Sequence, residues 1–142
     1  MEAHRILPIG IQDFEKLRTG NCLYVDKTSY VARLAIAEKP YFLSRPRRFG
    51  KSLFLSTLKY YFQGRKDLFE GLTIAELEKD WIEYPVFHLD MNVGRVTDMT
   101  SFLSTLNTNL RDLEQEWGKD PGDETPAARL DGLIKRAHKQ TG

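Results

Sequence analysis

The sequence contains one cysteine, Cys22, and three histidines. A single cysteine excludes a disulfide framework or a cysteine metal cluster within the chain, and His4, His88 and His138 show no metal-ligand spacing. No apolar run reaches the length of a membrane span, and the N-terminus lacks the apolar segment of a signal peptide. These absences predict a cytoplasmic protein with no membrane partner.

The net charge is also small, because 21 basic residues and 20 acidic residues leave a balance of +1. The chain has 142 residues, of which 41% are hydrophobic, and this suits one globular unit or part of one. The distribution of charge says more than its sum, since no Asp or Glu occurs from residue 39 to residue 66. The cations in this acid-free window are Lys39, Arg45, Arg47, Arg48, Lys51, Lys59, Arg65 and Lys66.

Inside this window, residues 41–53 read YFLSRPRRFGKSL. The pattern predicts a short apolar strand, a basic loop and a helix that begins near Lys51. This is the order of a phosphate-binding P-loop, in which backbone amides cradle phosphates, the lysine reaches the terminal ones and the hydroxyl group holds Mg²⁺. Gly50, Lys51 and Ser52 match the end of the motif G-x-x-x-x-G-K-[ST], whereas Arg45 stands at the first glycine position.

Electrostatics favour the same interpretation. A helix N-terminus attracts anions through its unpaired amides and its dipole. Arg45, Arg47, Arg48 and Lys51 add four cations within seven residues. The alternative is a solvated basic turn, but a neighbouring acidic partner would then be expected. We therefore predict a phosphate-binding loop.

The chain is expected to have three parts. Residues 1–40 form an entry segment and a helix, residues 41–64 form the strand, loop and helix of the P-loop, and residues 85–142 form a second strand and two helices. Residues that favour helix N-termini mark the later helix starts: Asp26, Thr97 or Asp98, and Thr125 followed by Pro126.

Strands alternating with helices predict an α/β fold, specifically a P-loop NTPase-like three-layer α/β/α domain with few parallel strands and about four to six helices. Only two strands, at residues 41–44 and 86–91, have a convincing pattern, and a sheet needs about three. We therefore expect residues 1–142 to be the N-terminal portion of one incomplete domain.

Four segments of the chain resemble the predicted AAA-ATPase-like family of bacterial proteins. They are LPIGIQDF (residues 7–14), YVDKT (24–28), FLSRPRRFGKSLFL (42–55) and YPVFHLD (84–90). The family has an arginine at the position of Arg45, so this residue agrees with the resemblance. The resemblance implies ATP and Mg²⁺ as cofactors and a longer protein, with a Walker B strand beyond this chain and often a C-terminal nuclease-like domain of the restriction-endonuclease type, through which DNA would be a partner.

The resemblance also implies which residues bind the nucleotide: Arg45, Pro46, Arg47, Arg48, Phe49, Gly50, Lys51, Ser52 and Leu53. The amides from Arg48 to Ser52 would hold the β-phosphate, Lys51 would bridge the β- and γ-phosphates, and Ser52 would ligate Mg²⁺. Whether Arg47 and Arg48 contact phosphate or a partner stays open.

Other candidate residues have two interpretations each. Ile9, Ile11 and Phe14 would line an adenine pocket by resemblance to related ATPases, or belong to an ordinary core. The stretch Asp26-Lys27-Thr28 is explained by helix capping, with a functional role as the alternative.

The segment Val86 to Asp90 has the outline of a Walker B strand, but His88 interrupts its apolar run and Met91 follows Asp90 where a catalytic Glu is expected. A structural strand is favoured. No carboxylate in the sequence is identified as the group that orients an attacking water.

Three functions remain open at this stage. The chain is the ATP-binding part of a P-loop ATPase with doubtful hydrolysis of its own, a basic nucleic-acid-binding module associated with a nuclease, or an inactive gene fragment. The basic patch lacks the interleaved aromatic residues of a nucleic-acid platform, which favours the first. The oligomeric state and the choice between ATP and GTP are not set by the sequence.

Overall fold

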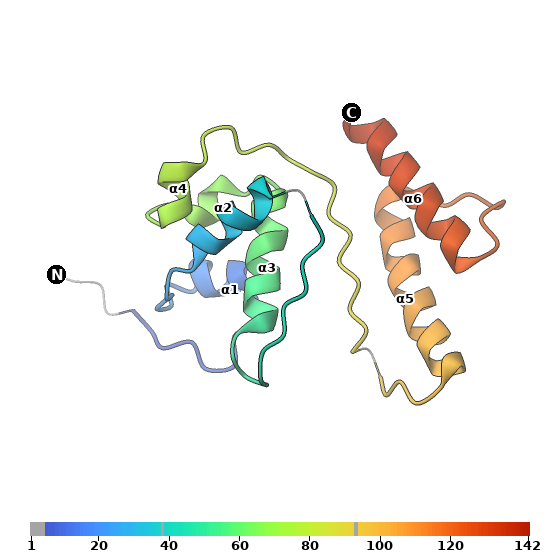
Figure 1. The fold of residues 1–142 in the computed structure, drawn as a ribbon, viewed down its shortest axis with the longest axis horizontal. Helices are drawn as coiled ribbons and strands as arrows, with labels where there is room; N and C mark the ends of the chain where they lie inside the picture. The colour runs from blue at the N-terminus through green and yellow to red at the C-terminus, as the bar shows by residue number, and fades with distance from the viewer. Residues whose placement is uncertain (1–4, 38, 93) are drawn as a thin grey trace. The chain divides into compact units, whose positions relative to one another are not determined.

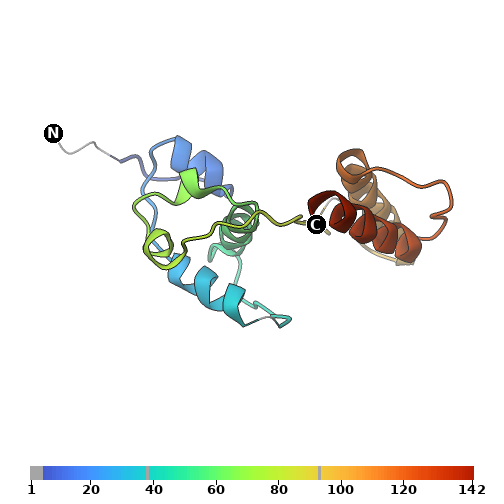
Figure 2. The ribbon, with the colours of Figure 1, turned by 90° about the horizontal axis from the view of Figure 1, so that it is seen from above.

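The computed structural model of the chain describes residues 5–37, 39–92 and 94–142. Residues 1–4 (which include His4), 38 and 93 lie outside the described residues, so the predicted segments 1–40 and 85–142 are described in part. The helical elements, seen from two directions in Figures 1 and 2, are α1 (Phe14–Thr19), α2 (Thr28–Ile36), α3 (Lys51–Phe62), the 3₁₀ helix η1 (Lys66–Phe69), α4 (Thr73–Leu77), α5 (Met99–Trp117) and α6 (Pro126–Thr141).

The predicted three-layer α/β/α fold is wrong, because the described residues form helices and no sheet. The β pairing found among them is a single parallel bridge between Ile6 and Cys22. Residues 41–44 and 86–91, predicted as strands, are largely extended but have no ladder with another described segment. Extended backbone is a local property, whereas a strand also needs a partner that takes its N–H and C=O groups.

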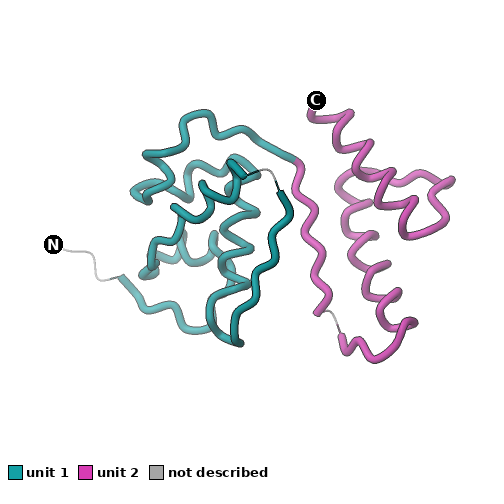
Figure 3. The backbone as a smooth tube through the Cα atoms, viewed as in Figure 1, with its two compact units in different colours: residues 1–84 teal, residues 85–142 magenta. Residues whose placement is uncertain are grey.

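The chain divides into two compact units, residues 1–84 and residues 85–142, which Figure 3 shows in different colours. In the described part of both units, no helix combines the length and the apolarity that a crossing of the membrane requires.

Unit 1 is held together by a core to which all its helices contribute. The buried residues of this core are Phe14, Val31, Tyr60, Leu68, Phe69, Leu72 and Ile74. The rings of Phe14 and Phe69 lie 4.8 Å apart between centroids. Helices as short as these are marginal by themselves in water, so packing onto this core stabilises them.

Unit 2 is a pair of helices whose starts agree with the predicted caps. At the start of α5, the carboxylate of Asp98 accepts a hydrogen bond from the amide of Ser101 at 2.7 Å. At the start of α6, the hydroxyl of Thr125 accepts from the amide of Ala128 at 3.2 Å, and Pro126 follows the cap. Both helices therefore begin where local sequence signals place them.

The two helices of unit 2 pack through an apolar seam and a buried ion pair. Leu110 and Leu113 of α5 meet Leu133 of α6. Beside them, the guanidinium of Arg129 donates two hydrogen bonds to Glu114, at 2.6 and 2.9 Å.

Candidate functional site

The predicted phosphate-binding loop leads from the extended segment into α3 and turns sharply before the helix. Residues 47 and 48 form a turn, and the backbone of Arg48 is left-handed with φ 65°. Gly50, the N-cap of α3, is also left-handed with φ 77°, a conformation that glycine adopts without strain. A Cβ atom at Gly50 would meet nothing within 4 Å, so the backbone conformation and not space favours glycine here.

The amides at the start of α3 have no acceptor in the part of the chain that the structure describes. Among the described residues, none of the hydrogen bonds uses the N–H of Gly50, Lys51 or Ser52, and no side chain caps the helix. The carbonyl of Gly50 accepts from the amide of Phe54 at 2.9 Å, which starts the helix regularly. Free amides at a helix N-terminus form a site for an anion, and the helix dipole adds to it.

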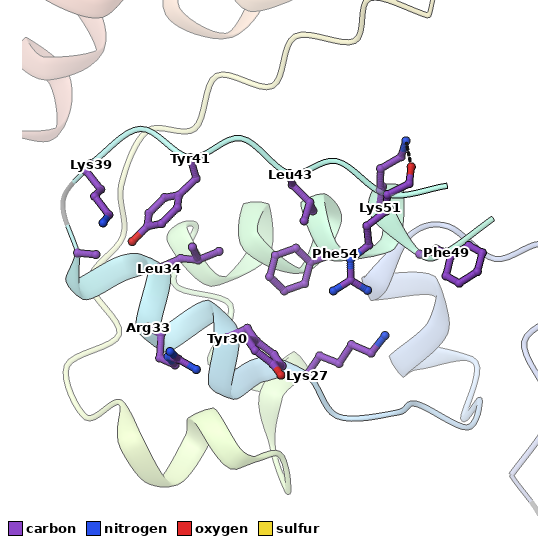
Figure 4. Close-up of a pocket in the computed structure, with 13 residues that line it drawn as sticks. Lys27, Tyr30, Arg33, Leu34, Lys39, Tyr41, Leu43, Phe49, Lys51 and Phe54 are labelled. Atoms are coloured by element: carbon purple, nitrogen blue, oxygen red, sulfur yellow. Dashed lines mark hydrogen bonds between the residues drawn. The ribbon is translucent and has the colours of Figure 1, made fainter. Parts of the chain in front are cut away.

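Lys51 lies against its own loop. Its Nζ donates a hydrogen bond to the carbonyl oxygen of Arg45 at 3.0 Å, the dashed line in Figure 4. Ser52, the next residue, is exposed on the first turn of the helix. A lysine held by one neutral carbonyl can exchange this partner for a negatively charged one, because charge-assisted hydrogen bonds are the stronger ones.

A cavity of about 500 Å³ opens beside this loop. Its walls are α2, the extended segment that precedes the loop, and the start of α3 (Figure 4). Five cations line it: Lys27, Arg33, Lys39, Arg45 and Lys51. None of the lining side chains in the described residues is acidic, and none of these cations forms an ion pair with a described carboxylate. The cavity therefore attracts anions.

The rest of the cavity wall is apolar or aromatic. Tyr30 and Leu34 come from α2, Tyr41 and Leu43 come from the extended segment, and Phe54 comes from α3. Tyr30 is 55% exposed, Tyr41 49% and Leu43 42%, so much of this surface is open to solvent. A combination of clustered cations and open aromatic surface fits a ligand with an anionic end and a flat apolar end.

The structure places four of the nine predicted site residues at the cavity: Arg45, Phe49, Gly50 and Lys51. The other five, which are Pro46, Arg47, Arg48, Ser52 and Leu53, lie in the same loop or first helical turn without lining the cavity. Their roles stay predictions.

The residues suggested for an adenine pocket do not line the cavity. Phe14 is completely buried in the core of unit 1, and Ile9 is 92% exposed. Ile11 is half-buried and is also absent from the cavity wall.

Of the cavity wall that α2 and its N-cap provide, the sequence had indicated only Lys27, in the stretch 26–28 for which a functional role was the alternative. Lys27 and Tyr30 lie about twenty residues before the loop, and their approach depends on how α2 packs onto the core through Val31. The acid-free window pointed to Lys39 but to no residue of α2.

Asp26 fixes the start of α2, and with it Lys27 and Tyr30. Its carboxylate accepts from the amide and hydroxyl of Thr28 at 2.8 and 2.6 Å, and from the amide and hydroxyl of Thr73, at the start of α4, at 2.7 and 2.8 Å. Partial burial raises the pKa of Asp26, but these hydrogen bonds outweigh it and lower the pKa to about 2. The N-cap position of α2 is Lys27 and not the predicted Asp26. Asp26, one residue earlier, accepts from the first residue of α2 and from the first residue of α4, so it joins two helix starts.

Asp26→Ala is expected to destabilise the chain by about 2 kcal/mol, because two helix N-termini each lose a cap of about 1 kcal/mol. The lowered pKa means that this contribution is complete above about pH 4 and is lost as the pH falls through about 2. Urea unfolding followed by circular dichroism at pH 6 and at pH 3 measures both effects. Asp26→Asn is the matched control, since it keeps one acceptor oxygen but cannot titrate. An alanine variant as stable as the parent would contradict the double cap.

Asp13 fixes the other side of α3. Its carboxylate accepts from the hydroxyls of Ser56 at 3.3 Å and Tyr60 at 3.1 Å, and the Ser56 hydroxyl accepts from the amide of Phe14 at 2.9 Å. Burial, together with the neighbouring Asp13 carboxylate, raises the pKa of Tyr60 to about 12. These contacts join α1 to α3, so the helix that begins at the loop is anchored along its length.

Comparison with known proteins gives two findings. The model of a family described as "Predicted AAA-ATPase" matches residues 8–142. A protein of Azotobacter chroococcum mcd 1, described as an uncharacterized protein in the vnfD 5′ region, is 41% identical over 138 residues, which are 96% of this chain and 27% of the relative. The chain thus spans about a quarter of the length of that relative. No solved structure matches the chain.

Proposed function

The chain belongs to the predicted AAA-ATPase family, and on this premise we propose that it is the ATP-binding part of an ATPase-like protein. The loop from Arg45 to Ser52 holds the phosphates of ATP, with Mg²⁺ bound at Ser52. The observation that carries this proposal is the set of free amides at Gly50, Lys51 and Ser52, which adjoin a cavity lined by five cations.

The arrangement supports triphosphate binding in two ways. The free amides and the dipole of α3 favour negative charge at the start of the helix. Lys51 can leave the carbonyl of Arg45 for a terminal phosphate oxygen, because its flexible side chain starts from the first residue of the helix.

The donor set also fits Mg²⁺. The hydroxyl of Ser52 is a hard oxygen donor, and its exposure leaves it accessible. Mg²⁺ prefers oxygen ligands and usually keeps several waters while binding substrate phosphates, so the Ser52 hydroxyl would supply one ligand beside phosphate oxygens and waters. Bound in this way, the ion would neutralise part of the phosphate charge.

The proposed function is ATP binding and does not include ATP hydrolysis. Hydrolysis requires a group that orients the attacking water, and no carboxylate lines the described part of the cavity wall.

Titration of Mg·ATP into the purified chain by calorimetry tests the proposal, and we expect saturable binding of one ATP per chain. A titration with a short DNA duplex in rising salt tests the alternative of a nucleic-acid-binding module. DNA binding with a steep salt dependence that excess Mg·ATP does not displace would favour that alternative. Binding of neither ligand would favour an inactive fragment and refute the proposed function.

A further inference from the structure

We propose that the apolar part of the cavity is a base-binding compartment, in which Tyr30, Leu34, Tyr41 and Phe54 hold the base of a nucleoside triphosphate. This inference rests on the proposed function, since it places the base by reference to the phosphate loop. The base compartment would allow the chain to prefer a nucleotide, because a phosphate loop alone would bind any polyphosphate.

Cations line the whole cavity, but the start of α3 adds amides without a described acceptor at one end, whereas apolar and aromatic side chains dominate the rest of the wall. Lys51 and Phe49 lie at one end, at the start of α3, whereas Leu34 and Tyr41 lie toward the other, and Phe54 lies between them (Figure 4). A volume of about 500 Å³ lies within the range of small-molecule sites, which is roughly 300–1,000 Å³. A nucleotide with its phosphates at Lys51 would therefore extend its base along the apolar wall.

The apolar wall has surface that a flat ring can cover. Tyr30 and Tyr41 are each about half exposed, at 55% and 49%. Cations lie over both rings, Arg33 over Tyr30 at 5.9 Å and Lys39 over Tyr41 at 5.6 Å. Positive charge beside open aromatic surface suits a ligand that joins an aromatic base to phosphates, and this complementarity distinguishes it from an apolar peptide or lipid.

The base is held by stacking and apolar contact. The described lining contains no Asp, Glu, Asn or Gln that could pair with the polar edge of a base. Stacking on aromatic side chains tolerates different bases, because every base has a π face. ATP and GTP are therefore expected to bind with affinities within about threefold of each other.

Calorimetry with three probes, Mg·ATP, Mg·GTP and Mg·tripolyphosphate, tests the compartment. The parent chain should bind ATP at least about tenfold more tightly than tripolyphosphate, as expected from stacking of one base. Leu34→Ala and Tyr41→Ala should each weaken ATP binding severalfold and leave tripolyphosphate binding unchanged. Ile36→Ala is the matched control, because Ile36 lies on α2, is 81% exposed and does not line the cavity.

The outcomes separate this inference from the proposed function. Equal affinity of the parent chain for ATP and tripolyphosphate would overturn the base compartment while the phosphate loop stands. If Leu34→Ala and Tyr41→Ala lose the same affinity for ATP and for tripolyphosphate, the base compartment is also overturned. A difference of more than tenfold between the affinities for ATP and GTP would overturn it as well. Failure of both ATP and tripolyphosphate to bind would remove the proposed function together with the compartment.

Discussion

Lys51→Ala is expected to weaken binding of Mg·ATP by about 10- to 100-fold, which is the loss of one hydrogen bond between charged groups. In the free chain, Nζ of Lys51 donates a hydrogen bond to the carbonyl oxygen of Arg45, 3.0 Å away. A hydrogen bond to this neutral oxygen is weaker than one to a phosphate oxygen. Transfer of the lysine to the ligand is therefore favourable. Calorimetric titration of both chains gives the ratio of dissociation constants directly.

The matched control for this experiment is Lys59→Ala. Lys59 lies on the same helix, 5.6 Å from the centre of the Tyr60 ring, and does not line the cavity. Its removal changes the net charge by the same amount as Lys51→Ala and should alter ATP affinity less than threefold. If both variants bind ATP as tightly as the parent chain, or if both lose the same affinity, Lys51 does not contact the phosphates.

Tripolyphosphate extends this comparison. Lys51→Ala should weaken tripolyphosphate and ATP by similar factors, because the lost contact is to phosphate in both. Leu34→Ala and Tyr41→Ala, in the base compartment, should weaken ATP binding and leave tripolyphosphate binding unchanged. The two sets of variants therefore report on opposite ends of one cavity.

Helix starts were predictable because their signals are local. Asp98 caps α5 and Thr125 caps α6 by hydrogen bonds to amides three residues later. Such contacts depend on a few consecutive residues, so they can be predicted without knowing the tertiary packing.

The lack of a sheet among the described residues could not be predicted, because strand pairing is not local. The pattern of residues 41–44 and 86–91 predicted two strands, but a local pattern cannot say whether another segment will pair with either of them. An apolar side chain such as Phe42, which is 94% exposed, satisfies the strand pattern and still lies in solvent.

The candidate site shows the same division. The loop could be located from the sequence, since Gly50, Lys51 and Ser52 are consecutive. The cavity wall formed by α2 could not be located in this way, because the position of Tyr30 at the cavity depends on how α2 packs. The role of Asp26 falls between these cases: its bond to Thr28 is local, whereas its bonds to Thr73 span 47 residues.

Arg129→Met is expected to destabilise unit 2 by about 3–5 kcal/mol, the usual cost of leaving one member of a buried ion pair without its partner. The side chains of Glu114 and Arg129 are only 6% and 14% exposed. Hydrogen bonds from Arg129 lower the pKa of Glu114 despite its burial. Without the guanidinium, the largely buried carboxylate must stay charged without its main partner or take up a proton.

The double variant Glu114→Leu with Arg129→Met should recover most of this loss, because no buried charge remains. Lys135→Met is the matched control on the same helix: Lys135 pairs with Asp131 at 2.6 Å, but both side chains are more than half exposed. Its removal should cost less than about 1 kcal/mol. Urea unfolding combined with hydrogen exchange of α5 and α6 measures these differences. Equal effects of Arg129→Met and Lys135→Met would show that burial does not set the strength of the Glu114 pair.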